Sequence, residues 1–235
     1  MTLDGQTLAE VMEATWPPAA QIPCGPFLLR DGAGGGKRVS AATVEGAFTG
    51  DDLARAEAAM GDQALFCIRE GDDDLDAALA ARGYSIVDPV LAYSAPVSAL
   101  IGEGAAHMTT FPHWPPMQIA RVLWADAGVG PARLAVMDRA KGAKTVILGR
   151  ANDRASGVAF VACHGRHAML HALEVAPAFR RQGSAQNILR AAAGWAQGQG
   201  ADSLSLVVTV ANAPARALYA GMGMVEGGRY HYRQA

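Results

Sequence analysis

A loop at residues 175–185 combines residue types that are suited to holding phosphate. Its sequence, Val-Ala-Pro-Ala-Phe-Arg-Arg-Gln-Gly-Ser-Ala, joins a strand-like run at 169–175 to a helix-like run at 185–195. The first N–H groups of such a helix have no partner within the helix and point outward, which makes a cradle for phosphate oxygens. Gly183 lets the backbone approach a ligand closely, and Arg180 and Arg181 bring positive charge. The loop alone does not decide between a nucleotide, a sugar phosphate and coenzyme A.

Two further segments decide in favour of coenzyme A. The pattern Arg180-x-x-Gly183-x-Ala185, after a strand that ends in Val-x-Pro, resembles the pyrophosphate-binding loop of the GCN5-related N-acetyltransferase (GNAT) superfamily. Downstream, Asn212-Ala-Pro-Ala-Arg-Ala-Leu-Tyr219-Ala-Gly-Met-Gly-Met resembles the Asn-x-x-Ala-x-x-x-Tyr-x-x-x-Gly-Phe segment of that family. The chain then runs through Gly-Arg-Tyr-His-Tyr-Arg, as do the last strands of many such enzymes. With three segments in the right order, the chain from about residue 115 onward is identified as a member of the superfamily.

The resemblance implies direct transfer of an acetyl group from acetyl-CoA, the co-substrate, to a primary amine. It implies that backbone groups of Leu173 and Val175 hold the pantetheine arm and the thioester, with the Val175 N–H polarising the carbonyl. The residues implied to bind the cofactor are Leu173, Val175, Arg180, Arg181, Gln182, Gly183, Ser184, Ala185, Gln186 and Asn212.

The resemblance also gives Tyr219 a catalytic role. Its position matches the residue that in many GNAT enzymes lies near the coenzyme sulfur and protonates the leaving thiolate. Outside that family pattern, a tyrosine in an amphipathic helix is half-buried packing.

His171 is the expected general base, acting directly or through water. Its ordinary pKa near ~6.5 suits deprotonation of an ammonium at neutral pH, and the resemblance places a base on this strand. Strand alternation predicts one face with Met169, His171, Leu173 and Val175, and the other with Ala172 and Glu174. In this family the first face looks onto the transfer site. A histidine satisfied in the core is the alternative, and Met169 stands where some relatives carry an acid or a histidine.

Composition excludes several other function classes. The chain has 235 residues, 51% of them hydrophobic, with no apolar stretch long enough to cross a bilayer and no secretory signal pattern. We therefore expect a globular, cytoplasmic protein without a membrane partner. The net charge of -2 without a basic stripe predicts no nucleic-acid partner. The three cysteines are too few and too scattered for a disulfide framework.

The order of elements after residue 117 matches the GNAT fold, an α/β (α+β) architecture with a central mixed, mostly antiparallel sheet flanked by helices. Residues 94–117 are rich in Pro, Gly and Ser, which is typical of a linker or a crossing segment. Periodicity predicts helices at 117–125, 131–140, 185–197 and 213–221, and strands at 145–149, 157–163, 168–175 and 203–208, with a final pair of strand segments between 224 and 233.

The first block repeats the end of the second in a weaker form. When Gly83 is set against Gly223, residues 63–68 fall on the strand 203–208 and residues 72–82 on the helix that starts at Asn212. The hydrophobic pattern survives the overlay, but Leu79 replaces Tyr219 and no Arg-x-x-Gly loop precedes it. We expect two copies in tandem: residues 1–95 a degenerate GNAT-like domain, 96–116 a linker, and 117–235 the catalytic domain. An unrelated α/β cap on a single acetyltransferase domain is the alternative.

Three other motifs are expected to be structural. The run Gly32-Ala-Gly-Gly-Gly-Lys37 lacks the first glycine and the Ser or Thr of a nucleotide-binding loop, so it predicts a flexible hairpin turn. The acidic run at 72–74 caps the helix that follows. Cys163, His164, His167 and His171 lack the spacing of a structural zinc site, and we expect no metal.

The acceptor is a small-molecule or peptide amine, and the sequence does not identify it further. We expect a monomer or a homodimer. Two other function classes stay open: a non-catalytic acyl-CoA-binding or sensor protein of the same fold, and an interaction module with a vestigial second block.

Overall fold

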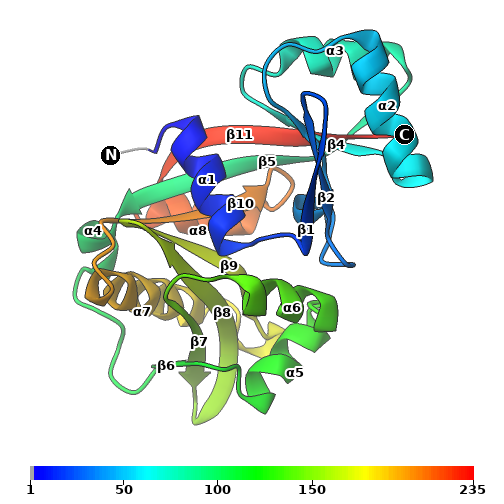
Figure 1. The fold of residues 1–235 in the computed structure, drawn as a ribbon. Helices are drawn as coiled ribbons and strands as arrows, with labels where there is room; N and C mark the ends of the chain where they lie inside the picture. Colours follow the sequence, from blue (N-terminus) through cyan, green and yellow to red (C-terminus); the bar gives the residue numbers. More distant parts are fainter. Residues whose placement is uncertain (1–2) are drawn as a thin grey trace.

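The computed structural model describes residues 3–235 and shows two successive α/β halves (Figure 1). The first half contains α1 (Gly5–Thr15), β1 (Ala20–Cys24), β2 (Phe27–Asp31), the 3₁₀ helix η1 (Lys37–Val39), β3 (Thr43–Val44), α2 (Gly50–Met60), the 3₁₀ helix η2 (Gly61–Gln63), β4 (Leu65–Arg69), α3 (Asp73–Ala81), β5 (Ser85–Pro96) and α4 (Val97–Ile101). The second contains β6 (Thr110–His113), α5 (Gln118–Asp126), α6 (Pro131–Arg139), β7 (Lys144–Ala151), β8 (Arg154–His164), β9 (His167–Val175), the 3₁₀ helix η3 (Pro177–Phe179), α7 (Ser184–Gly198), β10 (Ser203–Thr209), α8 (Ala213–Gly221) and β11 (Val225–Gln234).

One eight-stranded sheet runs through the molecule in the order β4-β11-β5-β10-β9-β8-β7-β6, and β1, β2 and β3 form a smaller sheet. Every neighbouring pair in the large sheet is antiparallel except β9 and β10. The predicted mixed, mostly antiparallel sheet flanked by helices is therefore confirmed. The helices predicted after residue 117 and the strands up to β10 form at the expected places within a few residues.

The final pair of strand segments is a wrong prediction. Residues 225–234 form the single strand β11, which lies between two strands of the first half, β4 and β5. Gly227 and Gly228 coincide with a register shift between Glu226 and Gly228. A bulge thus bends the strand without ending it.

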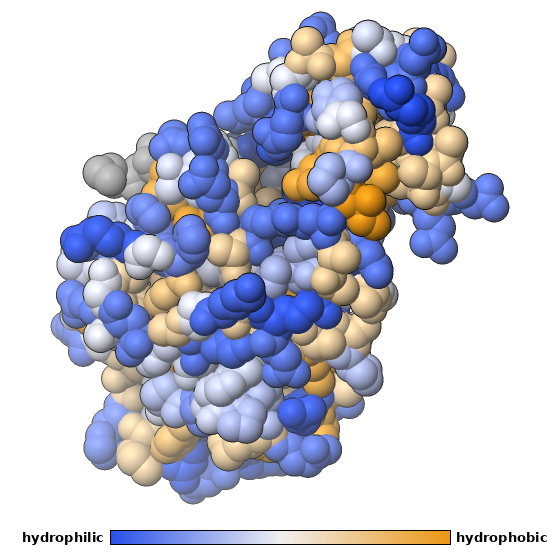
Figure 2. Space-filling model, viewed as in Figure 1, coloured by the Kyte–Doolittle hydropathy of each residue, from blue (hydrophilic) through white to orange (hydrophobic). Residues whose placement is uncertain are grey.

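Hydrophobic side chains fill the space on both faces of the large sheet. On one face, α4, α7 and α8 pack against the strands. The buried residues of α7 recur at helical spacing: Ile188, Leu189, Ala192, Ala193 and Ala196. On the other face, α1, α5 and α6 cover Phe160 through Trp16, Trp124 and Met137. The upper lobe in Figure 1, with the small sheet, α2 and α3, has its own apolar cluster around Phe66. Hydrophilic side chains cover most of the visible surface (Figure 2).

The two halves repeat one topology. In each, a three-stranded antiparallel unit is followed by a helix and then by a strand that meets the unit's third strand in parallel. That parallel contact is the bridge between Ala42 and Phe66 in the first half and the pairing of β9 with β10 in the second. The helix ends also match, because Tyr84 N–H donates to Leu79 O (3.1 Å) as Met224 N–H donates to Tyr219 O (3.0 Å).

The halves exchange their last strands. Instead of following its own β4, β5 pairs with β10, and β11 pairs with β4. The strand pairing has the symmetry that a two-fold axis requires. Adding 140 to a residue number of the first half gives its counterpart in the second, as Gly83 corresponds to Gly223. Replacing each residue by its counterpart converts one set of strand pairs into the other. The related pairs are Ile68 with His231 and Leu91 with Val208, and Val90 pairs with its own counterpart, Tyr230.

The expected boundaries at 95/96 and 116/117 stay predictions, and the sheet continues across both of them. The segment between them carries two elements of its own, α4 and β6. Among the helices of residues 3–235, none is both long and apolar enough to cross a membrane.

Candidate functional site

The loop between β9 and α7 presents free backbone N–H groups to solvent. Gly183 caps α7 in the left-handed conformation (φ 79°), and the Nε of Arg180 donates to Val175 O (3.2 Å). Asn187 makes the first backbone hydrogen bond of the helix, to Gly183 O (3.0 Å). Within residues 3–235, the N–H groups of the three preceding residues, 184–186, have no acceptor. The start of α7 therefore has the free N–H groups of the predicted phosphate cradle, and phosphate binding there stays a prediction.

The corresponding helix of the first half, α2, is closed to anions. Thr49 and Asp52 form a capping box, in which each side chain bonds the other residue's backbone N–H. Asp51 and Asp52 also place negative charge in the first turn, where a phosphate would otherwise bind. Of the two equivalent helix starts, only that of α7 can receive a phosphate.

The strands β9 and β10 separate toward the end of β9 that leads into this loop. They pair only where His167, Ala168 and Met169 face residues 203–205. Beyond that point β9 continues to Val175 and β10 to Thr209 without pairing to each other. The result is a wedge between the strands whose open end lies beside the start of α7.

A bulge in β9 changes which side chains face the wedge. Ala172 has φ 48°, and the register with β8 shifts between Val158 and Phe160. Leu173 consequently packs toward α7, whereas Glu174 lines the same cavity as His171. The predicted common face of Met169, His171, Leu173 and Val175, with Ala172 and Glu174 opposite, is therefore wrong from residue 172 onward.

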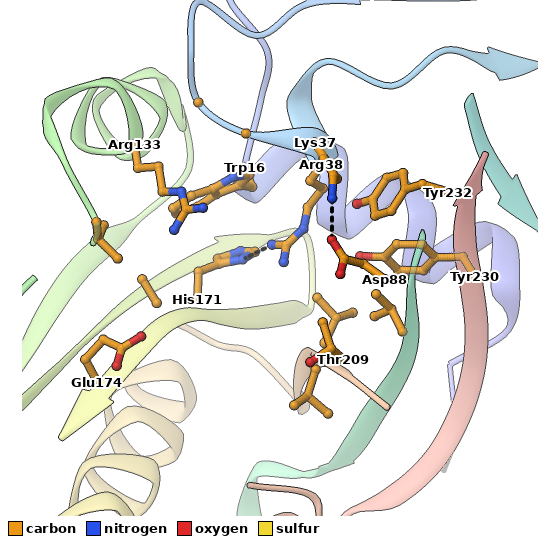
Figure 3. Close-up of a pocket in the computed structure, with 17 residues that line it drawn as sticks. Trp16, Lys37, Arg38, Asp88, Arg133, His171, Glu174, Thr209, Tyr230 and Tyr232 are labelled. Atoms are coloured by element: carbon orange, nitrogen blue, oxygen red, sulfur yellow. Dashed lines mark hydrogen bonds and ion pairs between the residues drawn. The ribbon is translucent and has the colours of Figure 1, made fainter. Parts of the chain in front are cut away.

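A cavity of about 430 Å³ occupies the wedge and is lined by both halves of the chain (Figure 3). The second half provides His171 and Glu174 from β9, the end of β10, Tyr230 and Tyr232 from β11, and Arg133 from α6. The first half provides Trp16, residues 35–38, Asp88 and Val90. In the cavity, Lys37 Nζ lies 2.6 Å from Asp88 Oδ2.

His171 is enclosed and uses both ring nitrogens. Only 4% of it is exposed, and its ring stacks on Trp16 with centroids 4.9 Å apart. Arg38 donates to Nδ1 (3.0 Å), which leaves the proton on Nε2 to be donated to Thr15 Oγ1 (2.9 Å). Burial, reinforced by the charge of Arg38, holds the pKa of His171 well below its ordinary value. The imidazole is neutral at pH 7, and its lone pair is already occupied.

Glu174 differs from His171 in the direction of its pKa shift and in its hydrogen bonding. Burial raises the pKa of its carboxyl above the ordinary value, against the smaller opposing effects of Arg180 and Arg133. Among the described residues no group donates a hydrogen bond to this carboxylate. An unpaired, partly desolvated carboxylate beside the wedge is chemically suited to accept a proton.

A family model for the acetyltransferase (GNAT) family matches residues 117–224. These residues belong to the GNAT family. A search of curated proteins found no match to the chain.

Solved structures show the same fold over nearly the whole chain. A GCN5-related N-acetyltransferase from Kribbella flavida has a TM-score of 0.72 at 15% identity, covering 97% of this chain and 94% of its own. A functionally unknown conserved protein from Staphylococcus epidermidis gives 0.70 at 11%, covering 96% and 98%. A tandem GNAT protein from the clavulanic acid biosynthesis pathway gives 0.64 at 15%, covering 97% and 87%. The likeness in fold thus extends over the first half, in which no Arg-x-x-Gly loop occurs before Gly83.

Tyr219 lies in the GNAT half on α8, beside the wedge and outside the cavity lining. It is 6% exposed and packs against Tyr93, with ring centroids 5.9 Å apart. Burial raises its pKa to about 12, and the nearby charge of Glu174 adds to the effect. The phenol therefore keeps its proton at neutral pH. Packing and proton donation are both compatible with this environment, so the catalytic role of Tyr219 stays a prediction.

Asn212 caps α8 of the GNAT half. Its Oδ1 accepts from Ala215 N–H (3.2 Å), and the residue is exposed. This cap explains the residue type by itself, while the side-chain amide N–H groups stay available to a ligand. Binding of the cofactor by Asn212 stays a prediction, as do the roles of Gln182, Ser184, Ala185 and Gln186.

Sequence reasoning missed the contribution of the first half to this site. The run Gly32–Lys37 with the following Arg38 predicts only a turn, and no motif points to Trp16. The pair of cations after a run of glycines was a visible signal, but nothing in the sequence places that turn against α6 of the GNAT half. In the structure Gly35 lies so close to Val136 that a Cβ at Gly35 would be 2.5 Å from it.

Proposed function

We propose that the chain is an acyl-CoA-dependent N-acyltransferase that moves the acetyl group of acetyl-CoA to a primary amine bound in the cavity. One observation carries the proposal: the wedge between β9 and β10 connects the free N–H groups of α7 to a cavity lined by charged side chains. A thioester lying in the wedge would have its phosphates at the helix start and its carbonyl at the cavity.

The donor side uses mostly backbone. N–H groups of residues 182–186 hold the pyrophosphate, with Arg180 and Arg181 at the rim. Backbone groups of Leu173 and Val175 hold the pantetheine arm, and the Val175 N–H stabilises the charge that develops on the carbonyl oxygen. Asn212 contacts the cofactor from α8.

The acceptor side supplies the proton transfers. The amine nitrogen forms a bond to the acetyl carbon, the carbon–sulfur bond breaks, and the amine loses one proton. We assign that proton to Glu174, because the lone pair of His171 is held by Arg38, although His171 stays the alternative base. The leaving sulfur takes up one proton, and we assign its delivery to Tyr219, which keeps its phenolic proton at neutral pH because burial raises its pKa to about 12 and which regains a proton from solvent after the transfer.

Calorimetry with acetyl-CoA tests the donor site. Gly183→Val introduces a β-branched residue at φ 79°, which should misplace the N–H groups of α7 and weaken binding at least about tenfold. The matched control is Gly194→Ala on the same helix, where a Cβ meets nothing within 4 Å; it should bind like the wild type.

Release of free thiol with a panel of amines tests the reaction. Equal affinity of wild type and Gly183→Val would contradict the donor site. Tight binding of acetyl-CoA without thiol release on any amine would instead favour the non-catalytic acyl-CoA-binding protein.

A further inference from the structure

The charged side chains of the cavity leave one cation without a counter-charge. Lys37 is paired with Asp88 at 2.6 Å, and the opposing charges of Arg133 and Glu174 are near enough for the arginine to lower the pKa of the carboxyl. Within residues 3–235 neither Arg133 nor Arg38 has a carboxylate within ion-pair distance, and the one hydrogen bond of Arg38 goes to the neutral ring of His171.

Contacts with His171 and Trp16 fix the position of the Arg38 side chain in the cavity. His171 fixes it from one side, and the chain of hydrogen bonds continues from His171 to Thr15 Oγ1 and from there to Val11 O (2.6 Å). The guanidinium also lies 5.8 Å from the centre of the Trp16 ring. Its Nε is buried without an acceptor among the described residues. A half-buried guanidinium with five N–H donors, one hydrogen bond and a buried Nε without an acceptor among the described residues has donors free for an anion.

On the basis of the proposed function, we infer that the acceptor amine also carries a carboxylate, and that Arg38 binds this carboxylate while the amine faces Glu174. The acceptor class is therefore a small aminocarboxylic acid. A carboxylate matches the planar fork of a guanidinium and neutralises the single excess cation. A doubly charged phosphate would leave the cavity with excess negative charge beside Glu174 and Asp88. The cavity volume of about 430 Å³ also suits a small molecule.

The glycine-rich turn explains how the first half supplies this residue. Gly36 has φ 98°, and the turn packs on α6 through Gly35, so the 3₁₀ helix that carries Arg38 reaches over the cavity of the other half (Figure 3). The half without a phosphate loop thus contributes acceptor specificity, and His171 is a positioning residue for Arg38.

The test compares matched acceptors, namely amino acids and their carboxamides, by the ratio of their kcat/KM values for thiol release. The wild type should favour the acids. Arg38→Gln should lower the acid-to-amide ratio by about 10- to 100-fold, as expected for a lost charge-assisted hydrogen bond. Arg38→Lys should give an intermediate ratio because it keeps the charge without the fork. The control Arg55→Gln, an exposed residue of α2, should keep the wild-type ratio.

A wild-type preference for carboxamides, or an Arg38→Gln ratio equal to that of the wild type, would overturn the inference. Thermal unfolding of each variant verifies folding, and Arg38→Lys decides if Arg38→Gln does not fold. Absence of thiol release with every amine would count against the proposed function instead. In that case calorimetric titration of the amino acids and carboxamides decides separately: acid binding that Arg38→Gln abolishes supports the inference, and equal or absent binding overturns it.

Discussion

His171 and Glu174 lie three positions apart on one strand, yet burial shifts their proton affinities in opposite directions. Removing a group from water disfavours its charged form, so the pKa of the histidine falls and that of the carboxyl rises. A base must hold a free lone pair where the proton is released. The hydrogen bond from Arg38 occupies that lone pair on His171. No described residue donates a hydrogen bond to the carboxylate of Glu174, so its lone pairs are free.

Glu174→Gln should lower kcat by about 100-fold or more, the usual contribution of a general base, with little change in acetyl-CoA affinity. Wild-type kcat should rise with pH through the raised pKa of Glu174, and the variant should lose that rise. His171→Gln is the comparison. Full activity of Glu174→Gln, with the pH-dependent limb lost only in His171→Gln, would return the role of base to the histidine.

The same variant has a second readout in stability. Because the folded-state pKa of Glu174 lies above its ordinary value near 4.5, the folded protein binds this proton more tightly than the unfolded chain does. The free energy of unfolding therefore falls as pH rises from about 4 through the folded pKa. Glu174→Gln should melt at a higher temperature than the wild type at pH 7, and the difference should vanish below about pH 4.

At the scale of elements, the bulge in β9 positions the site. Alternation along a regular strand would turn Glu174 away from His171, and the left-handed Ala172 brings both to the cavity. The opposite strand accommodates this through Gly157, where an added Cβ would lie 2.6 Å from the carbonyl oxygen of Glu174. Backbone at that distance cannot move aside without shifting the bulge.

Gly157→Ala should accordingly lower the free energy of unfolding by about 1–3 kcal/mol and reduce turnover by displacing Glu174. Gly194→Ala, in the exposed middle of α7, should raise it by about 0.5–1 kcal/mol, because alanine replaces glycine in a helix. Urea denaturation measures both. Wild-type stability and turnover in Gly157→Ala would show that β9 keeps its shape without the glycine.

Local sequence signals predicted the elements well where periodicity and caps determine them. Proline at the first position of α6 and the apolar spacing of α7 are such signals, and both helices form as expected. The bulge escaped prediction because its residue is alanine, which gives no sign of a left-handed conformation. The position of Arg38 escaped because it depends on packing between segments far apart in the chain.

At the scale of the molecule, the exchanged strands join the halves more firmly than the chain between them does. The first three strand contacts from the β4 edge of the large sheet, β4 with β11, β11 with β5 and β5 with β10, all join one half to the other. No sequence signal marks such an exchange, because β5 and β11 have similar patterns and either partner satisfies them. The cavity, lined from both sides, depends on it.

A protease site inserted into the mostly exposed segment 102–109, between α4 and β6, tests this arrangement. After cleavage, the two fragments should elute together in size-exclusion chromatography and keep acetyl-CoA binding, since the sheet contacts remain. Fragments that separate in native buffer would contradict the exchanged pairing. Cleaved protein in denaturant is the control for complete cutting.

The exchange also sets the order in which the protein can fold during synthesis. When β4 and β5 leave the ribosome, their final neighbours β10 and β11 have not been made, since these begin at Ser203 and Val225. Until then β4 and β5 either expose the unpaired N–H and C=O groups of their edges or pair with each other, and that pairing must later open. The β4 end of the sheet is therefore assembled last, and the nascent chain is most exposed to aggregation before that step.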